Sequence, residues 1–508
     1  MSKPVQPSIE TLTKLINQNS ESANVFPIFK YVDHNDVTIH QAYLKLAQVN
    51  NKDRSPSFLF ESSVKGDTVD RYSFIGINPS RIIKTGDDSK KYPKEYCDVD
   101  PITILEKELS AYKQASLPGL PKYSGGATGY ISYDCIKYFE PKTKRPLKDV
   151  LELPEAVFMF CDLVIAFDHV YQRFQIIYNI KLDETHDLTE EYNKGTQEIE
   201  KIEKILLSSD KVTPDQGPIK LGQTFTSNIG QSGYEGHVTK LKEHILKGDI
   251  IQAVPSQRIA RPTELHPFNI YRHLRTVNPS PYLFYIDLIE FQIIGASPEL
   301  LVQTDINDRV VTHPIAGTIP RGKTNEEDEK NAEILRDSLK DRAEHIMLVD
   351  LARNDINRVC QPKSNKVDKL LTIQRFSHVM HLVSEVSGTL RDDQTRFDAF
   401  RSIFPAGTTS GAPKVKAMEL IGELEKEKRG VYAGAVGHWG YDGKTMDTCI
   451  ALRTMVFKDG VAYLQAGGGI VFDSDEYEEY METMNKMRAN NNTIVEAEKN
   501  WAEKVGTL

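Results

Sequence analysis

The chain contains 508 residues, a length that allows roughly two to four domain-sized units or one large body of mixed helices and strands. Its 72 acidic and 63 basic residues give a formal net charge of -9, which disfavours nucleic acid as a partner but allows a small anion in a locally positive pocket. The 5 cysteines are scattered, no apolar stretch is long enough to span a membrane, and the first residues lack an apolar signal segment, so we expect a reduced, cytoplasmic protein.

The first part of the chain mixes strand and helix patterns. Apolar runs predict strands at 26–32, 57–63 and 72–80. An amphipathic stretch predicts a helix at 42–49, and two later apolar runs separated by 168–172 predict a hairpin. A charged helix is expected near 190–207.

A polar segment with two prolines and no periodicity, 208–223, separates this part from the rest. We therefore divide the chain into an N-terminal region at 1–207, a linker at 208–223 and a C-terminal region at 224–508. Cores on either side of this boundary can still share a sheet.

The C-terminal region opens with a predicted helix at 236–247, followed by an alternating strand pattern that carries Gln252. A later apolar strand ends at Ser297-Pro298-Glu299. A carboxyl group at such a strand end is either a cap with a low pKa or a functional group whose pKa is raised by burial among residues such as Ile294. Gln252 is equally consistent with an ordinary surface position.

Two acidic helix faces are the strongest chemical signal in the sequence. Asp341 and Glu344 lie three residues apart within a long helical pattern at 337–355, and Glu479 and Glu482 repeat this spacing within 475–488. Each face alone could simply be solvated. Two such helices facing one cleft would form a carboxylate site suited to Mg²⁺, whereas zinc is disfavoured because no Cys/His cluster has ligand spacing.

Glycine-rich and small-residue loops accompany these helices. The consecutive glycines Gly467, Gly468 and Gly469 are expected to adopt positive φ angles and to present bare N–H groups to an anion. Asp475 is expected to cap the helix that follows. The loop containing Thr408 is a second possible anion site or an ordinary connection. Arg453, in an otherwise apolar run, needs either a substrate carboxylate or an internal acidic partner.

Several strings resemble those of the chorismate-utilising enzymes, and within that family the large subunits of anthranilate synthases. These strings are HPIAGT, DRAEHIMLVDLARND, FPAGTTSGAPK, DTCIALRT and QAGGGIVFDSD. The resemblance covers essentially the whole chain and implies an α+β fold with large antiparallel sheets packed face to face and helices outside. It also implies that chorismate and ammonia are converted to anthranilate and pyruvate, the first committed step of tryptophan biosynthesis.

The resemblance implies a role for each candidate residue. Glu299 would protonate the departing hydroxyl group, and His381, otherwise an ordinary polar strand residue, would assist pyruvate elimination. Glu344, Glu482, Asp341 and Glu479 would hold Mg²⁺, Asp341 through water. The remaining residues would bind or position chorismate: Gly317, Thr318, Thr408, Tyr432, Arg453, Gly467, Gly468, Gly469 and Lys486.

Two positions distinguish this chain from related chorismate enzymes. Isochorismate and salicylate synthases have a water-activating lysine where this chain has Gln252, and aminodeoxychorismate synthases have a nucleophilic lysine where it has Ala316. Ammonia itself is therefore expected to attack the ring. No cysteine lies in a glycine-flanked nucleophile turn, so a separate glutaminase subunit, component II, is expected to supply ammonia.

The N-terminal region resembles the regulatory, tryptophan-binding part of the family, which implies feedback inhibition by tryptophan. Glu61 and Ser62 would meet Pro281, Tyr282 and Leu283 around the amino acid. An interdomain contact without ligand is the alternative. For the whole chain, the competing hypotheses are an aminodeoxychorismate or isochorismate synthase and a non-catalytic amino-acid sensor.

Overall fold

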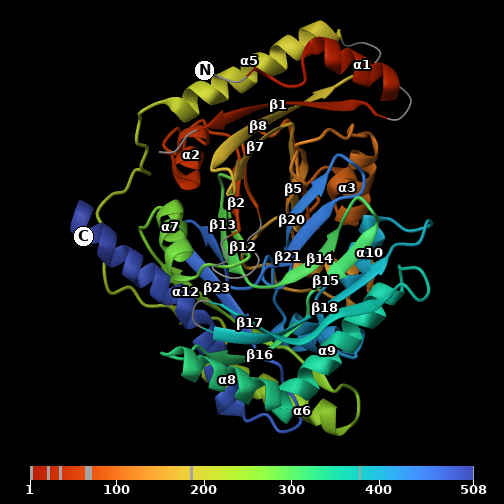
Figure 1. Cartoon of the computed structure of the whole chain (residues 1–508). Coiled ribbons are helices and arrows are strands. Elements are labelled where there is room, and N and C mark those ends of the chain that lie inside the picture. The colour runs from red at the N-terminus through yellow and green to blue at the C-terminus, as the bar shows by residue number, and fades with distance from the viewer. Residues whose placement is uncertain are drawn as a thin grey trace.

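Two large antiparallel sheets form the centre of the molecule, with helices on the outside (Figure 1). The computed structural model describes residues 4–19, 23–33, 37–62, 71–183, 187–376 and 379–506. Within these ranges the strands form an 11-stranded sheet and a 10-stranded sheet. Apolar side chains of both sheets, such as Phe284 and Val436, share one cluster between them. This arrangement confirms the predicted α+β class with face-to-face sheets.

Many neighbouring strands in the two sheets come from distant parts of the sequence. The larger sheet runs β1 (Val25–Asp33), β8 (Arg173–Lys181), β7 (Leu163–Asp168), β3 (Tyr72–Gly76), β2 (Ser57–Glu61), β12 (Tyr282–Asp287), β13 (Gln292–Ser297), β22 (Thr454–Lys458), β23 (Val461–Gly467), β11 (Ser256–Pro262) and β9 (Thr226–Ser227). The other runs β16 (Ile315–Pro320), β18 (Val379–Thr389), β15 (Arg309–Thr312), β14 (Leu300–Thr304), β21 (Met446–Ile450), β20 (Ala435–Gly440), β5 (Gly126–Ile131), β6 (Ala156–Cys161) and β4 (Arg81–Thr85), with β17 (Lys366–Arg375) paired to β18. A short ladder joins β10 (Gln252–Ala253) to β19 (Gly411–Ala412).

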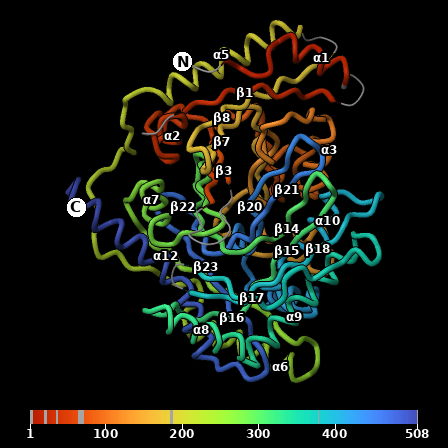
Figure 2. The backbone as a smooth tube through the Cα atoms, in the orientation of Figure 1, coloured from red at the N-terminus to blue at the C-terminus, as the bar shows by residue number. Residues whose placement is uncertain are grey.

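The helices lie around these sheets. They are α1 (Ile9–Asn19), α2 (Ile39–Leu46), α3 (Pro101–Ser110), α4 (Ile136–Phe139), α5 (Leu188–Leu207), α6 (Gly230–Leu246), α7 (Pro267–Val277), α8 (Asn325–Asp337), α9 (Leu339–Asn357), α10 (Arg396–Ile403), α11 (Lys414–Glu425) and α12 (Glu476–Val505). Figure 2 shows α1 and α5 above β1 and β8 at the top of the view, and α12 at the lower left. None of the helices in the described ranges is both long and apolar enough to cross a membrane.

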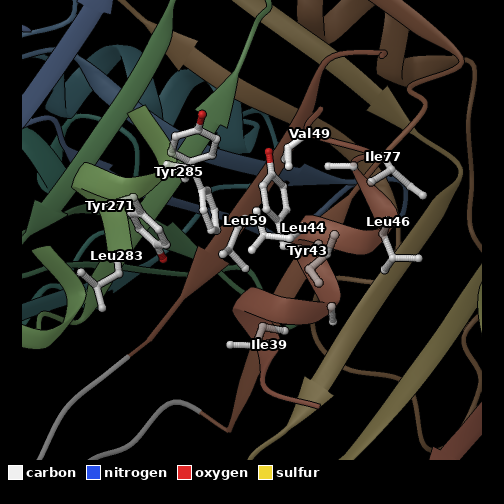
Figure 3. Packing of buried hydrophobic residues seen from close by; sticks show 14 of the residues in the cluster. Ile39, Tyr43, Leu44, Leu46, Val49, Leu59, Ile77, Tyr271, Leu283 and Tyr285 are labelled. Atoms are coloured by element: carbon white, nitrogen blue, oxygen red, sulfur yellow. The ribbon is translucent and has the colours of Figure 1, made fainter. Parts of the chain in front are cut away.

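Both sheets combine strands from before and after the linker 208–223. In the larger sheet β2 pairs with β12, which places Leu59 opposite Tyr285. The apolar cluster in Figure 3 also joins the two parts, because Tyr43 packs edge-on against Tyr285 with ring centroids 5.7 Å apart. The boundary visible in the sequence therefore lies between regions whose sheets and cores are continuous.

Some local predictions need correction. The apolar run 157–167 is divided at Asp162 into β6 and β7, which belong to different sheets. The strand pattern around Gln252 is interrupted before β11, where Pro255 supplies no N–H for a ladder. The helix expected at 42–49 is α2, which begins three residues earlier because Thr38 caps it by accepting a hydrogen bond from the Gln41 N–H.

Candidate active site

Carboxylates from α9 and α12 face each other across the three-glycine turn that follows β23. A Cβ atom added to Gly468 would lie 3.0 Å from Glu479 Oε2 and 3.7 Å from Glu482 Oε1. One added to Gly469 would lie 3.6 Å from Glu344 Oε1. The structure thus brings the two predicted acidic helix faces to one place, which neither helix pattern alone could show.

The glycines of this turn serve close packing, and the prediction that they adopt positive φ angles is wrong. A Cβ atom would lie 2.5 Å from Pro255 O at Gly467 and 2.1 Å from Gln252 Nε2 at Gly469, so larger residues would clash. Gly317 is different. It has a φ of 70° at a bulge between β16 and β18, a conformation that favours glycine.

The cluster of carboxylates from α9 and α12 has the chemistry of a site for a hard cation such as Mg²⁺. Burial raises the pKa of Glu344, and the nearby charges of Glu482 and Asp341 raise it further. Burial also raises the pKa of Glu479, whose Oε2 is buried and has no hydrogen-bond partner in the described part of the chain. A cation would provide that missing partner. No group of three His, Cys, Asp or Glu side chains in metal-ligand arrangement occurs among the described residues, but Mg²⁺ needs only one or two carboxylates besides water and substrate oxygens.

Asp341 and Lys486 have local partners beside this group. Asp341 belongs to the first turn of α9, where Ser338 Oγ donates to its carboxylate and accepts from its backbone N–H. Lys486 donates to Gly467 O at 2.9 Å and forms a 2.7 Å ion pair with Glu482. The ammonium group therefore lies at the glycine turn, as expected of a residue that binds an anion there.

Glu299 is buried just beyond the end of β13. Burial raises its pKa to about 8, although a hydrogen bond of 3.1 Å from Thr408 Oγ1 and the charge of Arg453 oppose this shift. At neutral pH the group is therefore protonated and can donate a proton, as a general acid must. Of the two expectations for this strand end, the structure shows a buried carboxyl with a raised pKa and not a cap with a low pKa, while its role as an acid stays a prediction.

His381 lies on β18 with one ring nitrogen engaged and the other open. Nδ1 is 2.9 Å from Gly317 O and 3.1 Å from Thr318 Oγ1. Burial and the charge of Arg453 lower its pKa to about 4, so the ring is neutral at pH 7. When Nδ1–H donates to Gly317 O, Nε2 is left as an acceptor, and this buried atom has no partner in the described ranges. The ring is therefore neutral and has an open acceptor at Nε2.

The two positions that distinguish related enzymes also lie here. Gln252 is buried, and its Nε2 donates to Glu344 Oε1 at 3.2 Å, so the amide orients a carboxylate and provides no base. Ala316 is buried opposite Leu382 on β18 and offers no nucleophile. Gln252 is not the surface residue that the sequence pattern also allowed.

Arg453 and Tyr432 are two further residues that the sequence predicts to bind the substrate. Arg453 has a φ of 48° between β21 and β22, and burial lowers its pKa while the charge of Glu299 opposes that shift. In the described part of the chain no carboxylate lies within ion-pair distance of its guanidinium, which leaves the group available to an anion. The Tyr432 hydroxyl lies at Gly467, 3.1 Å from where a Cβ atom would be.

A cavity lies between the two sheets, lined by residues of β2, β3 and β12 on one side and of β20 and β21 on the other. It encloses about 490 Å³, part of which is open to solvent. All the residues predicted to bind an amino acid line it: Glu61, Ser62, Pro281, Tyr282 and Leu283. Ser62 Oγ is buried without a hydrogen-bond partner among the described residues, so the cavity offers an unused polar group beside aromatic walls.

Glu61 is less available than the sequence suggested. Its carboxylate accepts hydrogen bonds from Tyr271 at 2.6 Å and from both Nε and Nη2 of Arg275, at 3.0 and 2.7 Å. The positive charge of Arg275, which lies on α7, thus already compensates the negative charge of Glu61. Another carboxylate of the cavity is Asp447, which accepts from Tyr282 at 3.1 Å. Sequence reasoning missed Asp447 because β20 and β21 show no pattern that places them opposite β2.

Sequence reasoning also missed Tyr234. This buried tyrosine lies on α6, accepts a hydrogen bond from the Gly468 N–H at 3.1 Å and donates to Pro255 O at 3.2 Å. It fixes the glycine turn against the chain that leads into β11. Val238 and Leu241 follow it at helical spacing on the buried face of α6, which makes it indistinguishable in sequence from a core residue.

Three comparisons with known proteins show which proteins this chain is similar to. Residues 55–492 match the model of the chorismate binding enzyme family. Anthranilate synthase component 1 of Saccharomyces cerevisiae is 67% identical over 507 residues, covering 99% of each chain, and a probable anthranilate synthase component 1 of Schizosaccharomyces pombe is 55% identical over 98% of each. The crystal structure of anthranilate synthase component I from Streptococcus pneumoniae superposes with a TM-score of 0.73 at 35% identity, covering 90% of this chain and 99% of that one.

Proposed function

Because the chain belongs to the chorismate-binding enzyme family, we propose that it catalyses the anthranilate synthase reaction, in which chorismate and ammonia give anthranilate and pyruvate. The observation that carries this proposal is that the buried carboxyl of Glu299 and the buried ring of His381 both lie within the electrostatic influence of Arg453, in a chain that matches anthranilate synthase component 1 over 99% of its length. This reaction is the first committed step of tryptophan biosynthesis, and we place it in the cytoplasm.

Chorismate has two carboxylates, and the site offers a positive group for each. Mg²⁺, when held by Glu344 and Glu482 with Glu479 and Asp341 beside them, would neutralise the ring carboxylate. Arg453 and Lys486 would bind the enolpyruvyl carboxylate together with the N–H groups of the glycine turn. Gly317, Thr318 and Tyr432 would complete the walls.

The first chemical step is amination. Ammonia forms the new C–N bond at the ring carbon that is aminated in anthranilate, and the ring double bonds shift as the bond from the ring to the 4-hydroxyl oxygen breaks. Glu299 gives its proton to that oxygen so that water leaves, and the new amine gives up one proton. Thr408 orients the acid through its hydrogen bond. Since Gln252 supplies no base and Ala316 no nucleophile, the isochorismate and aminodeoxychorismate alternatives are not favoured.

The second step is elimination of pyruvate. His381 Nε2 assists the removal of the ring proton, the bond between the ring and the enolpyruvyl oxygen breaks, and the ring becomes aromatic. Replacing His381 with methionine should slow this step more than amination, because methionine fills the space without providing an acceptor for the proton. Liquid chromatography of quenched reactions should then show an aminated intermediate that still bears the enolpyruvyl group. Unreacted chorismate alone would place His381 in the first step or in folding.

The chain needs an external source of ammonia, for which we propose a separate glutaminase subunit. With chorismate, Mg²⁺ and ammonium the purified chain should form anthranilate, detected by its fluorescence, whereas glutamine in place of ammonium should give almost none. Product formation from glutamine by the chain alone would contradict the partner proposal, and absence of anthranilate under both conditions would contradict the proposed reaction.

We propose that the cavity between the sheets binds tryptophan and inhibits the enzyme. Ser62 and Asp447 would meet the polar end of the amino acid, and the aromatic walls, including Phe60 and Phe74, would hold the indole. Since the cavity joins β2 and β12 to β20 and β21, a ligand there can bias the separation of the two sheets and hence the position of Glu299, which lies between β13 of one sheet and β14 of the other.

Replacing Ser62 with leucine should abolish inhibition, since the larger side chain occupies the cavity. We expect inhibition of the wild-type enzyme to be competitive with chorismate or nearly so, and the variant to keep its turnover when tryptophan is absent. Rate measurements over a tryptophan series test this expectation. Unchanged tryptophan sensitivity of the variant would refute the site.

A further inference from the structure

Behind the candidate site lies a buried ion pair that none of the proposed steps uses. Arg429 is 2% exposed, and its Nε and Nη2 donate to the two carboxylate oxygens of Glu425 at 2.9 and 2.8 Å. Burying such a pair is costly and seldom increases stability over apolar residues of the same size. A specific structural requirement is therefore the better explanation for its presence.

The guanidinium of Arg429 also binds two separate backbone segments. Nη1 donates to Thr409 O at 2.9 Å, and Nη2 donates to Val254 O at 2.7 Å. Its carbon lies 5.6 Å from the ring centroid of Tyr432. Thr409 follows Thr408, the residue that donates to Glu299, and Val254 lies two residues after Gln252.

Glu425 extends this network to the glycine turn. Its Oε1 accepts hydrogen bonds from the Ser256 N–H at 2.7 Å and from Ser256 Oγ at 2.9 Å. Ser256 is paired with Gly467 in the ladder between β11 and β23. The ion pair thus contacts the loop that carries Thr408 and the segment that follows Gln252, and it reaches the glycine turn indirectly, through Ser256.

We propose that Arg429, held by Glu425, is a positioning residue that fixes Thr408 against Glu299 and aligns the loops around chorismate. The inference rests on the proposed function. This positioning role requires an arginine. Its planar guanidinium donates four hydrogen bonds in different directions, and a lysine ammonium on a single flexible stem cannot reproduce this geometry.

A positioning role of Arg429 affects the pKa of Glu299, which a purely structural role would not. The hydrogen bond from Thr408 lowers the pKa of Glu299 relative to burial alone. Releasing Thr409 O frees Thr408, so the pKa of Glu299 should rise and the alkaline fall of kcat should move to higher pH. A displacement of about 1 Å can slow catalysis about a hundredfold, so kcat should fall strongly while KM for chorismate changes little.

The experiment compares R429K, T408V and the double variant by kcat against pH, with melting temperatures measured alongside. The alkaline limb is the part of the profile in which kcat falls as the pH rises. We expect each single variant to move this limb to higher pH by a similar amount and the double variant to show no further shift, because both changes remove the same hydrogen bond. R396K is the matched control. Arg396 is equally buried and donates to the carbonyls of Gly440 and Thr445, remote from Glu299, so its replacement should lower the melting temperature and leave the limb in place.

An unmoved limb in R429K, or a shift in the double variant equal to the sum of the single shifts, would overturn the inference while leaving the proposed function intact. If the wild-type chain forms no anthranilate, the proposed function itself fails. Should R429K not fold, E425Q takes its place. It keeps the size of the side chain but removes the charge that holds Arg429, and the same limb shift is expected, with an unmoved limb again counting against the proposal.

Discussion

Replacing Glu299 with glutamine should lower kcat about a thousandfold, because a positioned general acid typically contributes 10²- to 10⁴-fold and an amide cannot give its proton to the leaving hydroxyl. The side chain keeps its size and its hydrogen bond from Thr408, so the fold should persist. Steady-state anthranilate fluorescence measures the rate, and circular dichroism checks the fold.

The pH dependence provides an independent check on Glu299. Since the pKa of this carboxyl group is raised to about 8, the acid is present below that pH, and activity should fall as the pH rises through it. On the acidic side, His381 with a pKa lowered to about 4 stays neutral above that value, so protonation of this ring should not set the acidic limit of activity. A fall centred near the usual pKa of a glutamate would contradict the role of Glu299.

E498Q is the control for E299Q. Glu498 is also buried, and its carboxylate pairs with Arg261 at 2.7 Å, distant from the glycine turn. Removing that charge should reduce stability by about 3–5 kcal/mol and leave the turnover of the folded protein and its alkaline limb unchanged. If E498Q slowed turnover as much as E299Q, loss of a buried charge rather than loss of the acid would explain both results.

Replacing Glu482 with glutamine should abolish Mg²⁺-dependent turnover while the fold is kept. Its carboxylate is about half exposed and paired with Lys486, so little packing is lost, but a neutral amide is a poor ligand for a hard cation. Isothermal titration with Mg²⁺ and chorismate should show binding weakened at least about tenfold, alongside the lost activity. Wild-type Mg²⁺ affinity in an active variant would refute the metal assignment.

E496Q is the matched control on the same helix. Glu496 is 56% exposed and contacts only His273 among the described ion pairs. Its replacement removes the same charge from α12 at a distance from the glycine turn. Mg²⁺ binding and turnover should remain as in the wild type, which separates a specific ligand from a general effect of charge on the helix.

Much of the site was predictable because its chemistry lies in short strings with fixed spacing. The acidic pairs on α9 and α12, the carboxyl at the end of β13 and the glycine turn each have a local sequence signal, and the structure brings them together. The reason for the glycines was not predictable. Their φ angles are not positive, and the need for small residues arises from Gln252 in β10 and from Pro255 just after it, which are far from the glycines in sequence.

Residues that act through long-range contacts had no local signal. Arg429 and Glu425 look like a surface pair four residues apart at the end of a helix, yet the fold leaves only 1% of the Arg429 side chain and 8% of the Glu425 side chain exposed. The apolar run 157–167 shows the same limit, because periodicity indicates strands but not which sheet each strand joins. The position of Asp447 beside the predicted amino-acid site likewise depends on how the two sheets face each other.

The most direct test of the proposed reaction is a single-turnover experiment with chorismate, Mg²⁺ and ¹⁵N-labelled ammonium, followed by mass spectrometry of the products and the protein. The account predicts equal amounts of ¹⁵N-anthranilate and pyruvate, with the protein at its unmodified mass throughout. Isochorismate, an aminated end product that retains the enolpyruvyl group, or a covalent adduct on the protein would contradict it.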